Sequence, residues 1–225
     1  VSQIVATMLL VYLFSLRNFA VGTTYARTEA FLTAVVGALA FGATISLQGW
    51  LAIGVSVAGV VMITVVRTGL DQSGGLASRL LNRPAAVGLG SGLGFALAVL
   101  FIREASLSLQ LNTYAYPAAL TLITLIVMQC VMLGSYVFVT QRGQFAIMAQ
   151  QWKVGVFVGG MSTAGSIGWF TAVTIQNAAY VKALGQIEFI FTLAISMLFF
   201  KEKSSRGEII GMLLVVLGIV YLLAV

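Results

Sequence analysis

Long apolar runs separated by short polar breaks constrain the fold of this chain more than any other feature. A helix of about 20 apolar residues crosses the hydrocarbon core of a bilayer, and the alternating segments of about ten residues that a barrel requires are absent. Only 8% of the residues are charged, too few to cover a soluble globule. The sequence therefore predicts an all-α polytopic membrane protein. Eight spans are expected, at 1–22, 28–46, 49–66, 86–102, 113–139, 154–175, 183–200 and 208–225.

Positively charged residues gather in alternate loops between these spans. The richer loops hold Arg27, Arg67, Arg79, Arg83, Arg142, Lys153, Lys201, Lys203 and Arg206. The opposite loops hold only Arg103 and Lys182. Because Lys and Arg accumulate on the cytoplasmic side, we expect the richer loops there and Val225 outside. The net charge of +6 then reflects membrane topology, so nucleic acid is not an expected partner.

One segment recurs at a constant offset. Residues 17–66 align without gaps on residues 176–225, shifted by 159 positions (176 − 17). The polar pairs of this alignment are Asn18 with Asn177 and Glu29 with Glu188. These pairs carry most of the similarity, because apolar residues match one another by composition alone. Weak internal symmetry of this kind is typical of transporters.

The two copies differ in what precedes them. Two expected helices stand between a loop that contains Gly, Ser and Pro and the sixth span, 154–175, whereas the equivalent first span, 1–22, has no such helices before it. We therefore expect a fragment of a ten-helix protein. Residues 1–66 would be the last three helices of the first repeat, 67–85 the inter-repeat loop and 86–225 the second five-helix repeat. An odd number of helices per repeat inverts the second copy relative to the first.

Two carboxylates fall within expected spans. Glu188 lies about five residues inside its helix, beside Ile187, and Glu29 lies closer to a helix start, with Arg27 nearby. An ionised carboxylate at such depth is costly unless it is paired or hydrated. Each could therefore exchange a proton during transport or bind a cationic group. The alternative is that each only complements the positive N-terminal end of its helix.

Further candidates lie near the same helix junctions. They are Asn18, Asn177, Gln186, Lys182, Trp169 and Tyr180. A helix break near residues 177–182 could turn the Lys182 amine inward, although a lysine in a loop more often extends to the lipid headgroups. The amides could bind a substrate or satisfy free backbone groups, and the aromatic rings could line a pocket or simply pack.

The residue inventory disfavours an enzyme. The chain has no His, its only Asp is Asp71, and no Walker-type phosphate loop is present. These absences exclude His-based nucleophile activation, the usual His zinc sites and an aspartyl dyad. Cys130 is a lone cysteine in an apolar span. We expect no catalytic residue, no metal and no cofactor.

Several strings resemble a known family. They are Arg17-Asn18-Phe19-Ala20-Val21-Gly22-Thr23 running into Thr28-Glu29-Ala30, Gly168-Trp169-Phe170, Gln176 to Glu188, and Phe199-Phe200-Lys201-Glu202-Lys203 followed by Gly211 and Gly218. Together they resemble the EamA-like branch of the drug/metabolite transporter superfamily. The resemblance implies ten helices in two inverted halves, a central substrate cavity and alternating access. One departure is Ala43, which stands where the second copy has Glu202 of the family's turn.

These observations predict a secondary transporter, most simply an exporter of small organic metabolites such as amino acids. The resemblance favours a multi-pass protein of a bacterial-type inner membrane, as a monomer or an oligomer, whose partners are the substrate, the bilayer and protons carried by Glu188 and Glu29. The alternative is a non-transporting membrane assembly or regulatory subunit, in which both Glu residues only stabilise helix ends.

Overall fold

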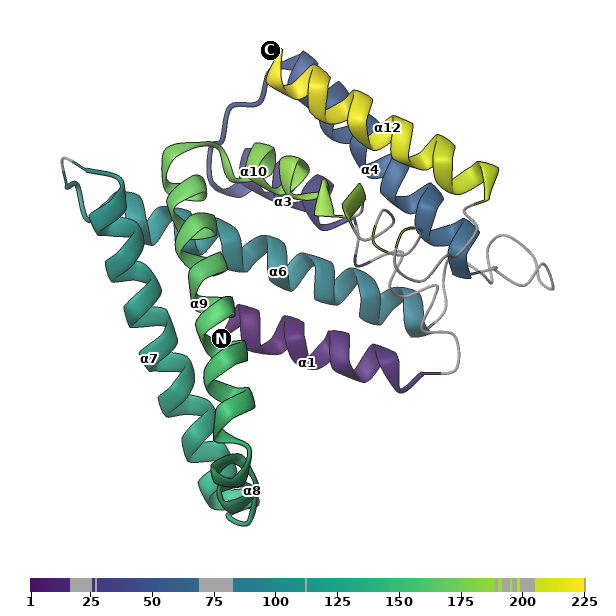
Figure 1. The fold of residues 1–225 in the computed structure, drawn as a ribbon. Helices are drawn as coiled ribbons and strands as arrows, with labels where there is room; N and C mark the ends of the chain where they lie inside the picture. The colour runs from purple at the N-terminus through teal and green to yellow at the C-terminus, as the bar shows by residue number, and fades with distance from the viewer. Residues whose placement is uncertain are drawn as a thin grey trace. The chain divides into compact units, whose positions relative to one another are not determined.

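In the part of the chain that it describes, the computed structural model has helices as its regular secondary structure. That part comprises residues 1–16, 26, 28–68, 83–111, 113–188, 190–191, 195, 198 and 205–224. Its helices are α1 (Ser2–Phe14), α3 (Glu29–Ala40), α4 (Leu47–Thr68), α6 (Arg83–Ser108), α7 (Ala115–Thr140), α8 (Gln144–Gln150), α9 (Trp152–Ile175), α10 (Ala178–Gly185) and α12 (Arg206–Leu223) (Figure 1). Asn18 and most of the predicted loop 67–85 lie outside the described residues. The all-α fold class is confirmed.

Four of the described helices are long and apolar enough to cross a membrane. They are α6, α7, α9 and α12. α1, α3 and the Leu47–Ile63 part of α4 are shorter apolar helices. The chain is therefore a multi-pass membrane protein, while the number of eight spans stays a prediction.

Several predicted element boundaries are wrong. α1 ends at Phe14 and α3 at Ala40, where the expected spans continue to residues 22 and 46. The span expected at 86–102 extends from Arg83 to Ser108, because a proline such as Pro84 is tolerated in the first turn of a helix, where its missing N–H has no partner to lose. The helix expected over 183–200 is preceded by α10, which ends at Gly185 and is followed by a turn at residues 186–187. Lys182 consequently lies inside a helix, not in a loop.

The chain divides into two compact units. The first comprises Ser2–Leu100 with Asn177–Val225, and the second comprises Phe101–Gln176 with Val1. The first unit thus contains nearly all of both repeated segments, although they are far apart in the sequence.

Arg103 caps the C-terminal end of α9 in the second unit. Its guanidinium donates hydrogen bonds to the backbone carbonyls of Val173 and Gln176. Carbonyls at a helix C-terminus lack intrahelical donors, so a cation there stabilises the helix. Beside this contact, Thr174 Oγ1 donates to Ser106 Oγ at 2.8 Å, and both side chains are buried. Arg103 was predicted as a loop residue, and these acceptors explain how it remains in α6.

In the first unit α4 and α12 pack antiparallel in close contact (Figure 1). Gly207, at the start of α12, faces Val66 near the end of α4, whereas Gly218 faces Ser56 farther back along α4. A Cβ atom at Gly218 would lie 2.7 Å from the backbone nitrogen of Ser56. The small residues therefore let the two backbones approach, as is common between membrane helices.

The contacts of Gly59 mirror those of Gly218. A Cβ atom at Gly59 would lie 2.6 Å from the carbonyl oxygen of Gly211 and 2.7 Å from the nitrogen of Val215. The offset of 159 places Gly59 on Gly218, and it relates Gly211 and Val215 to Ala52 and Ser56, the residues that Gly218 meets. Each glycine therefore contacts, on the facing helix, the residues that are equivalent by the repeat offset to those that contact the other glycine.

Candidate functional site

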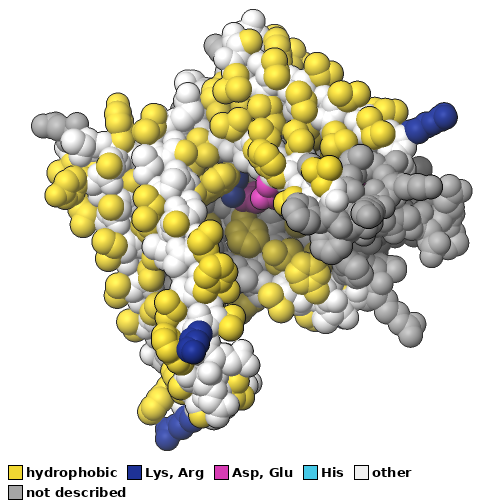
Figure 2. Space-filling model, in the orientation of Figure 1, with side chains coloured by type: hydrophobic (Ala, Val, Ile, Leu, Met, Phe, Trp, Pro, Cys, Tyr) yellow, Lys and Arg dark blue, Asp and Glu magenta, His cyan; other side chains and the backbone are white. Residues whose placement is uncertain are grey.

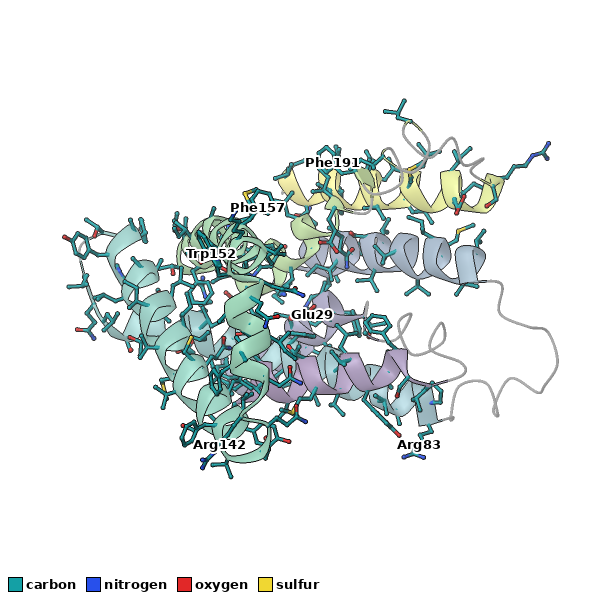
Figure 3. The ribbon with its side chains drawn as sticks, turned by 60° about the horizontal axis from the view of Figure 1, so that its bottom comes forward. Glu29, Arg83, Arg142, Trp152, Phe157 and Phe191 are labelled. Atoms are coloured by element: carbon teal, nitrogen blue, oxygen red, sulfur yellow. The ribbon has the colours of Figure 1, made fainter. Side chains whose placement is uncertain are left out.

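A partly buried ion pair joins α3 to α10 in the first unit. Lys182 Nζ lies 2.5 Å from Glu29 Oε1, with side-chain exposures of 17% and 23% respectively. Glu29 is the first residue of α3, and its Oε1 atom is itself buried. Figure 2 shows an acidic and a basic group side by side among hydrophobic side chains, and Figure 3 labels Glu29 within the first unit. The structure thus brings together two of the predicted site residues.

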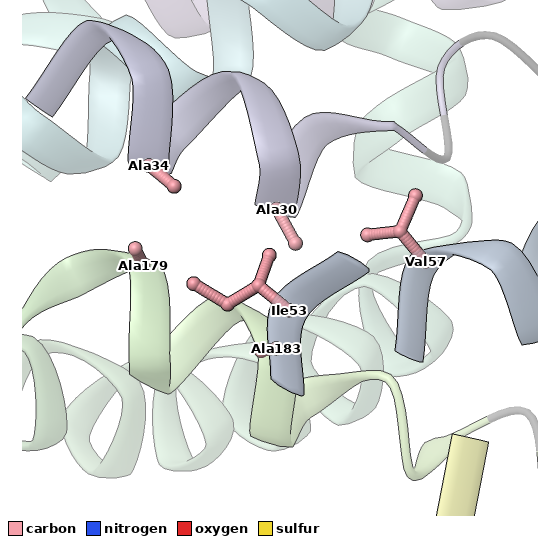
Figure 4. Packing of buried hydrophobic residues seen from close by; sticks show 6 residues of the cluster. All are labelled: Ala30, Ala34, Ile53, Val57, Ala179 and Ala183. Atoms are coloured by element: carbon pink, nitrogen blue, oxygen red, sulfur yellow. The ribbon is translucent and has the colours of Figure 1, made fainter. Parts of the chain in front are cut away.

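Small apolar residues position this pair. Ala30 and Ala34 of α3 face Ala179 and Ala183 of α10, and Ile53 and Val57 of α4 complete the cluster (Figure 4). Alanines spaced four residues apart lie on one helix face, so they let α3 and α10 approach closely. Glu29 and Lys182 each directly neighbour one of these alanines, which brings their long side chains within reach of each other.

The ion pair corrects one expectation for Lys182. A lysine near a helix junction was expected to extend towards the headgroups more often than inward, yet its ammonium contacts the Glu29 carboxylate. Separating the two charges in an apolar surrounding would leave each without compensation, which is costly. Because each group compensates the charge of the other, both can lie between the helices, where neither charged group would be stable alone.

A second polar contact lies just past the end of α10, at its C-cap residue Gln186. Ser56 Oγ of α4 donates a hydrogen bond of 2.5 Å to Gln186 Oε1, and the two residues are 0% and 7% exposed. Gln186 follows Lys182 by four residues, a spacing that places both on the same helix face. Ser56 was not among the predicted site residues, because a serine in an apolar span usually marks only close helix packing.

Replacing Ser56 with Ala should lower the free energy of unfolding by about 1–2 kcal/mol, because the buried Gln186 carbonyl loses its donor while the helix packing hardly changes. Unfolding of purified protein in mixed micelles, titrated with SDS, measures this. Ser108→Ala is the matched control, since the Ser108 hydroxyl is exposed and bonds only within its own helix. An equal loss in both variants would contradict the role assigned to Ser56.

Asn177 and Tyr180 secure the α3–α4 connection. Asn177 Oδ1 accepts from the Ala179 N–H at 3.0 Å and caps α10, while its Nδ2 donates to the Thr44 carbonyl at 3.5 Å. The Tyr180 hydroxyl accepts a bond of 3.4 Å from the Ser46 N–H. A pocket of about 520 Å³ opens here, lined by Thr44, Ile45, Ser46, Gln48, Tyr180 and Leu222.

The remaining predicted site residues are not joined to the ion pair by the contacts described above. Glu188 is exposed and begins the chain segment after the turn at 186–187. Trp169 lies on α9 in the second unit, where it is half-buried. Their roles, like that of Asn18, stay predictions.

The family model of the EamA-like transporter family matches residues 83–224, which is more than half of the 225-residue chain. The matched range includes Lys182 and Gln186 but neither Glu29 nor Ser56. No curated protein matches the chain.

Proposed function

Because the chain belongs to the EamA-like transporter family, we propose that it is a secondary transporter that exports small organic metabolites by alternating access. The proposal places it in an inner membrane and couples transport to protons. The observation that carries it is the Glu29–Lys182 ion pair, which holds two opposite, partly buried charges at the contact between α3 and α10. Ionisable groups inside membrane proteins commonly mark the path of a substrate or a proton.

The position of the ion pair between the two copies supports this role. Transporters built from repeats bind their substrates at the interface between the repeats. Glu29 belongs to the first copy and Lys182 to the second, so the pair fits this condition.

The α4–α12 pair supports inverted repeats. α4 begins at Leu47 and α12 at Arg206, which differ by the repeat offset (206 − 47 = 159). Equivalent helices of inverted repeats must run in opposite directions, and these two pack antiparallel with exchanged contacts at Gly59 and Gly218. We therefore propose a pseudo-twofold axis in the membrane plane between these helices.

The ion pair also suits an amino acid as substrate. A zwitterion offers an ammonium to Glu29 and a carboxylate to Lys182. It can therefore replace both partners at once, and no buried charge is left uncompensated as the pair opens. In this proposal Glu188, which lies beyond the turn after α10, carries the coupling proton.

Export is tested by profiling metabolites in the medium of cells that express the chain. Metabolites should accumulate outside the cells, and the same compounds should then show counterflow in proteoliposomes. Glu29→Gln/Lys182→Met protein is the matched control and should release none of them. If no metabolite moves and variants of the two Glu residues lower only thermal stability, the chain is instead a non-transporting assembly or regulatory subunit.

Replacing Glu188 with Gln should remove the dependence of flux on a pH gradient, because the amide cannot exchange a proton. Counterflow, which needs no gradient, should continue at near its original rate. Flux of the identified metabolite in vesicles with and without an imposed pH gradient measures both. Full gradient-driven flux in this variant would end the coupling role of Glu188 while leaving the transporter proposal intact.

A further inference from the structure

The connection between α7 and α9 concentrates positive charge at one end of the second unit. Arg142 and Lys153 flank α8, and both are exposed. The sequence contains no Asp or Glu between Ala105 and Ile187, so no carboxylate of this long stretch can neutralise them. The acidic residue of the second unit, Glu104, lies in α6 beside Arg103. The connection at 141–153 therefore carries a formal charge of +2 from Arg142 and Lys153.

The same connection exposes large apolar side chains. Phe145, Met148 and Ala149 follow the i, i+3, i+4 spacing that places residues on one helix face. Phe145 and Met148 are 41% and 63% exposed, and the following Trp152 is 60% exposed (Figure 3). An apolar face beside cations and a tryptophan is typical of segments that lie in the membrane–water interface.

The arrangement of the unit places α8 along the membrane surface. Figure 1 shows α8 nearly end-on at the point where α7 and α9 meet, so α8 crosses the direction of both. α7 and α9 are both long and apolar enough to span the bilayer. A short helix that lies across their ends is therefore roughly parallel to the bilayer plane.

Arg142 is held in a conformation that leaves donors free for an anion. Its Nε atom donates to the Phe138 carbonyl at 3.0 Å, and its guanidinium lies 4.5 Å from the centre of the Phe138 ring. A guanidinium has five N–H donors, and the terminal ones make no hydrogen bond to the described residues. Two such donors match the oxygens of a phosphate.

We propose that residues 141–153 bind the headgroups of anionic phospholipids. Arg142 and Lys153 contact the lipid phosphates, while Phe145, Met148 and Trp152 enter the interfacial region beneath them. The occupant is a lipid because the cations stand beside an exposed apolar face at the end of two membrane-spanning helices. Each cation near an anionic surface should favour the acidic lipid by about fivefold.

The test uses Trp152 as a fluorescent reporter of the lipid beside it. The chain has three tryptophans, so Trp50→Phe/Trp169→Phe leaves Trp152 alone. The protein is reconstituted in vesicles of phosphatidylcholine with added phosphatidylglycerol, and one of the two lipids carries brominated chains that quench tryptophan. Brominated phosphatidylglycerol should quench Trp152 several-fold more effectively than brominated phosphatidylcholine, and salt should weaken this preference.

Variants of Arg142 and Lys153 test whether the lipid preference depends on the positive charge of these residues. Arg142→Gln/Lys153→Gln should bring the preference close to one, whereas Arg142→Lys/Lys153→Arg should retain it. A protein with Trp169 alone reports the opposite end of α9, about 25 Å away, and should show no preference. Equal quenching by both lipids in the parent protein, or an unchanged preference in the neutral variant, overturns the proposal. Neither result bears on transport.

Discussion

Replacing Lys182 with Met is expected to lower the free energy of unfolding by about 3 kcal/mol and to reduce substrate flux by at least about tenfold. The single substitution leaves the partly buried Glu29 carboxylate between α3 and α10 without its counter-ion at 2.5 Å. The stability loss lies at the lower end for buried pairs, because both side chains are partly accessible. SDS-titrated unfolding in micelles and counterflow in proteoliposomes measure the two effects.

The double variant distinguishes a stabilising contact from a functional one. Glu29→Gln/Lys182→Met removes both charges, so most of the lost stability should return relative to the single variant. Flux should stay low, because neither charge remains to bind the substrate. If flux recovers together with stability, the ion pair only holds the helices together, and the site assignment is wrong.

Replacing both Gly59 and Gly218 with Ala should destabilise the protein by about 4 kcal/mol, about 2 kcal/mol for each site. The added Cβ atoms would lie 2.6–2.9 Å from backbone atoms of the facing helix, which cannot rotate away as a side chain would. α4 and α12 would have to separate along their whole contact. The same unfolding titration measures the loss.

Gly54→Ala is the matched control for this substitution. Gly54 lies on α4 as well, but a Cβ atom there would meet nothing within 4 Å. Alanine also favours the helical backbone over glycine by up to about 1 kcal/mol. Gly54→Ala should therefore be neutral or slightly stabilising. A comparable loss at Gly54 would show that the helix interior, rather than the α4–α12 contact, is sensitive to alanine.

The helical fold and the family could be predicted from the sequence because each rests on local patterns. Apolar runs long enough to span a bilayer predict α6, α7, α9 and α12 directly. The polar strings around Asn177 and Glu188 gave the resemblance that the family model confirms over residues 83–224. The repeat offset relates Gly59 to Gly218, and each of the two faces the other helix of the α4–α12 pair.

The partner of Lys182 could not be predicted, because periodicity within one helix does not reveal which helices pack together. One signal was present: Ala30 and Ala34 in the first copy, and Ala179 and Ala183 in the second, both follow the small-residue spacing of close helix contacts. The end of α10 also had a signal in Gly185, a residue common at helix ends. Ser56 gave none, since its role depends entirely on Gln186 across the helix interface.

The glycine contacts between α4 and α12 have a mechanical consequence. Backbones that meet through glycine cannot slide past each other without passing through steric overlap, so we expect these two helices to stay together throughout a transport cycle. α3 and α10 meet through the methyl groups of alanines, which protrude little from the helix surface. One of these helices can therefore shift along the other by small steps. Opening and closing of the substrate path should therefore fall to α3 and α10, with α4 and α12 as the stationary part against which they move.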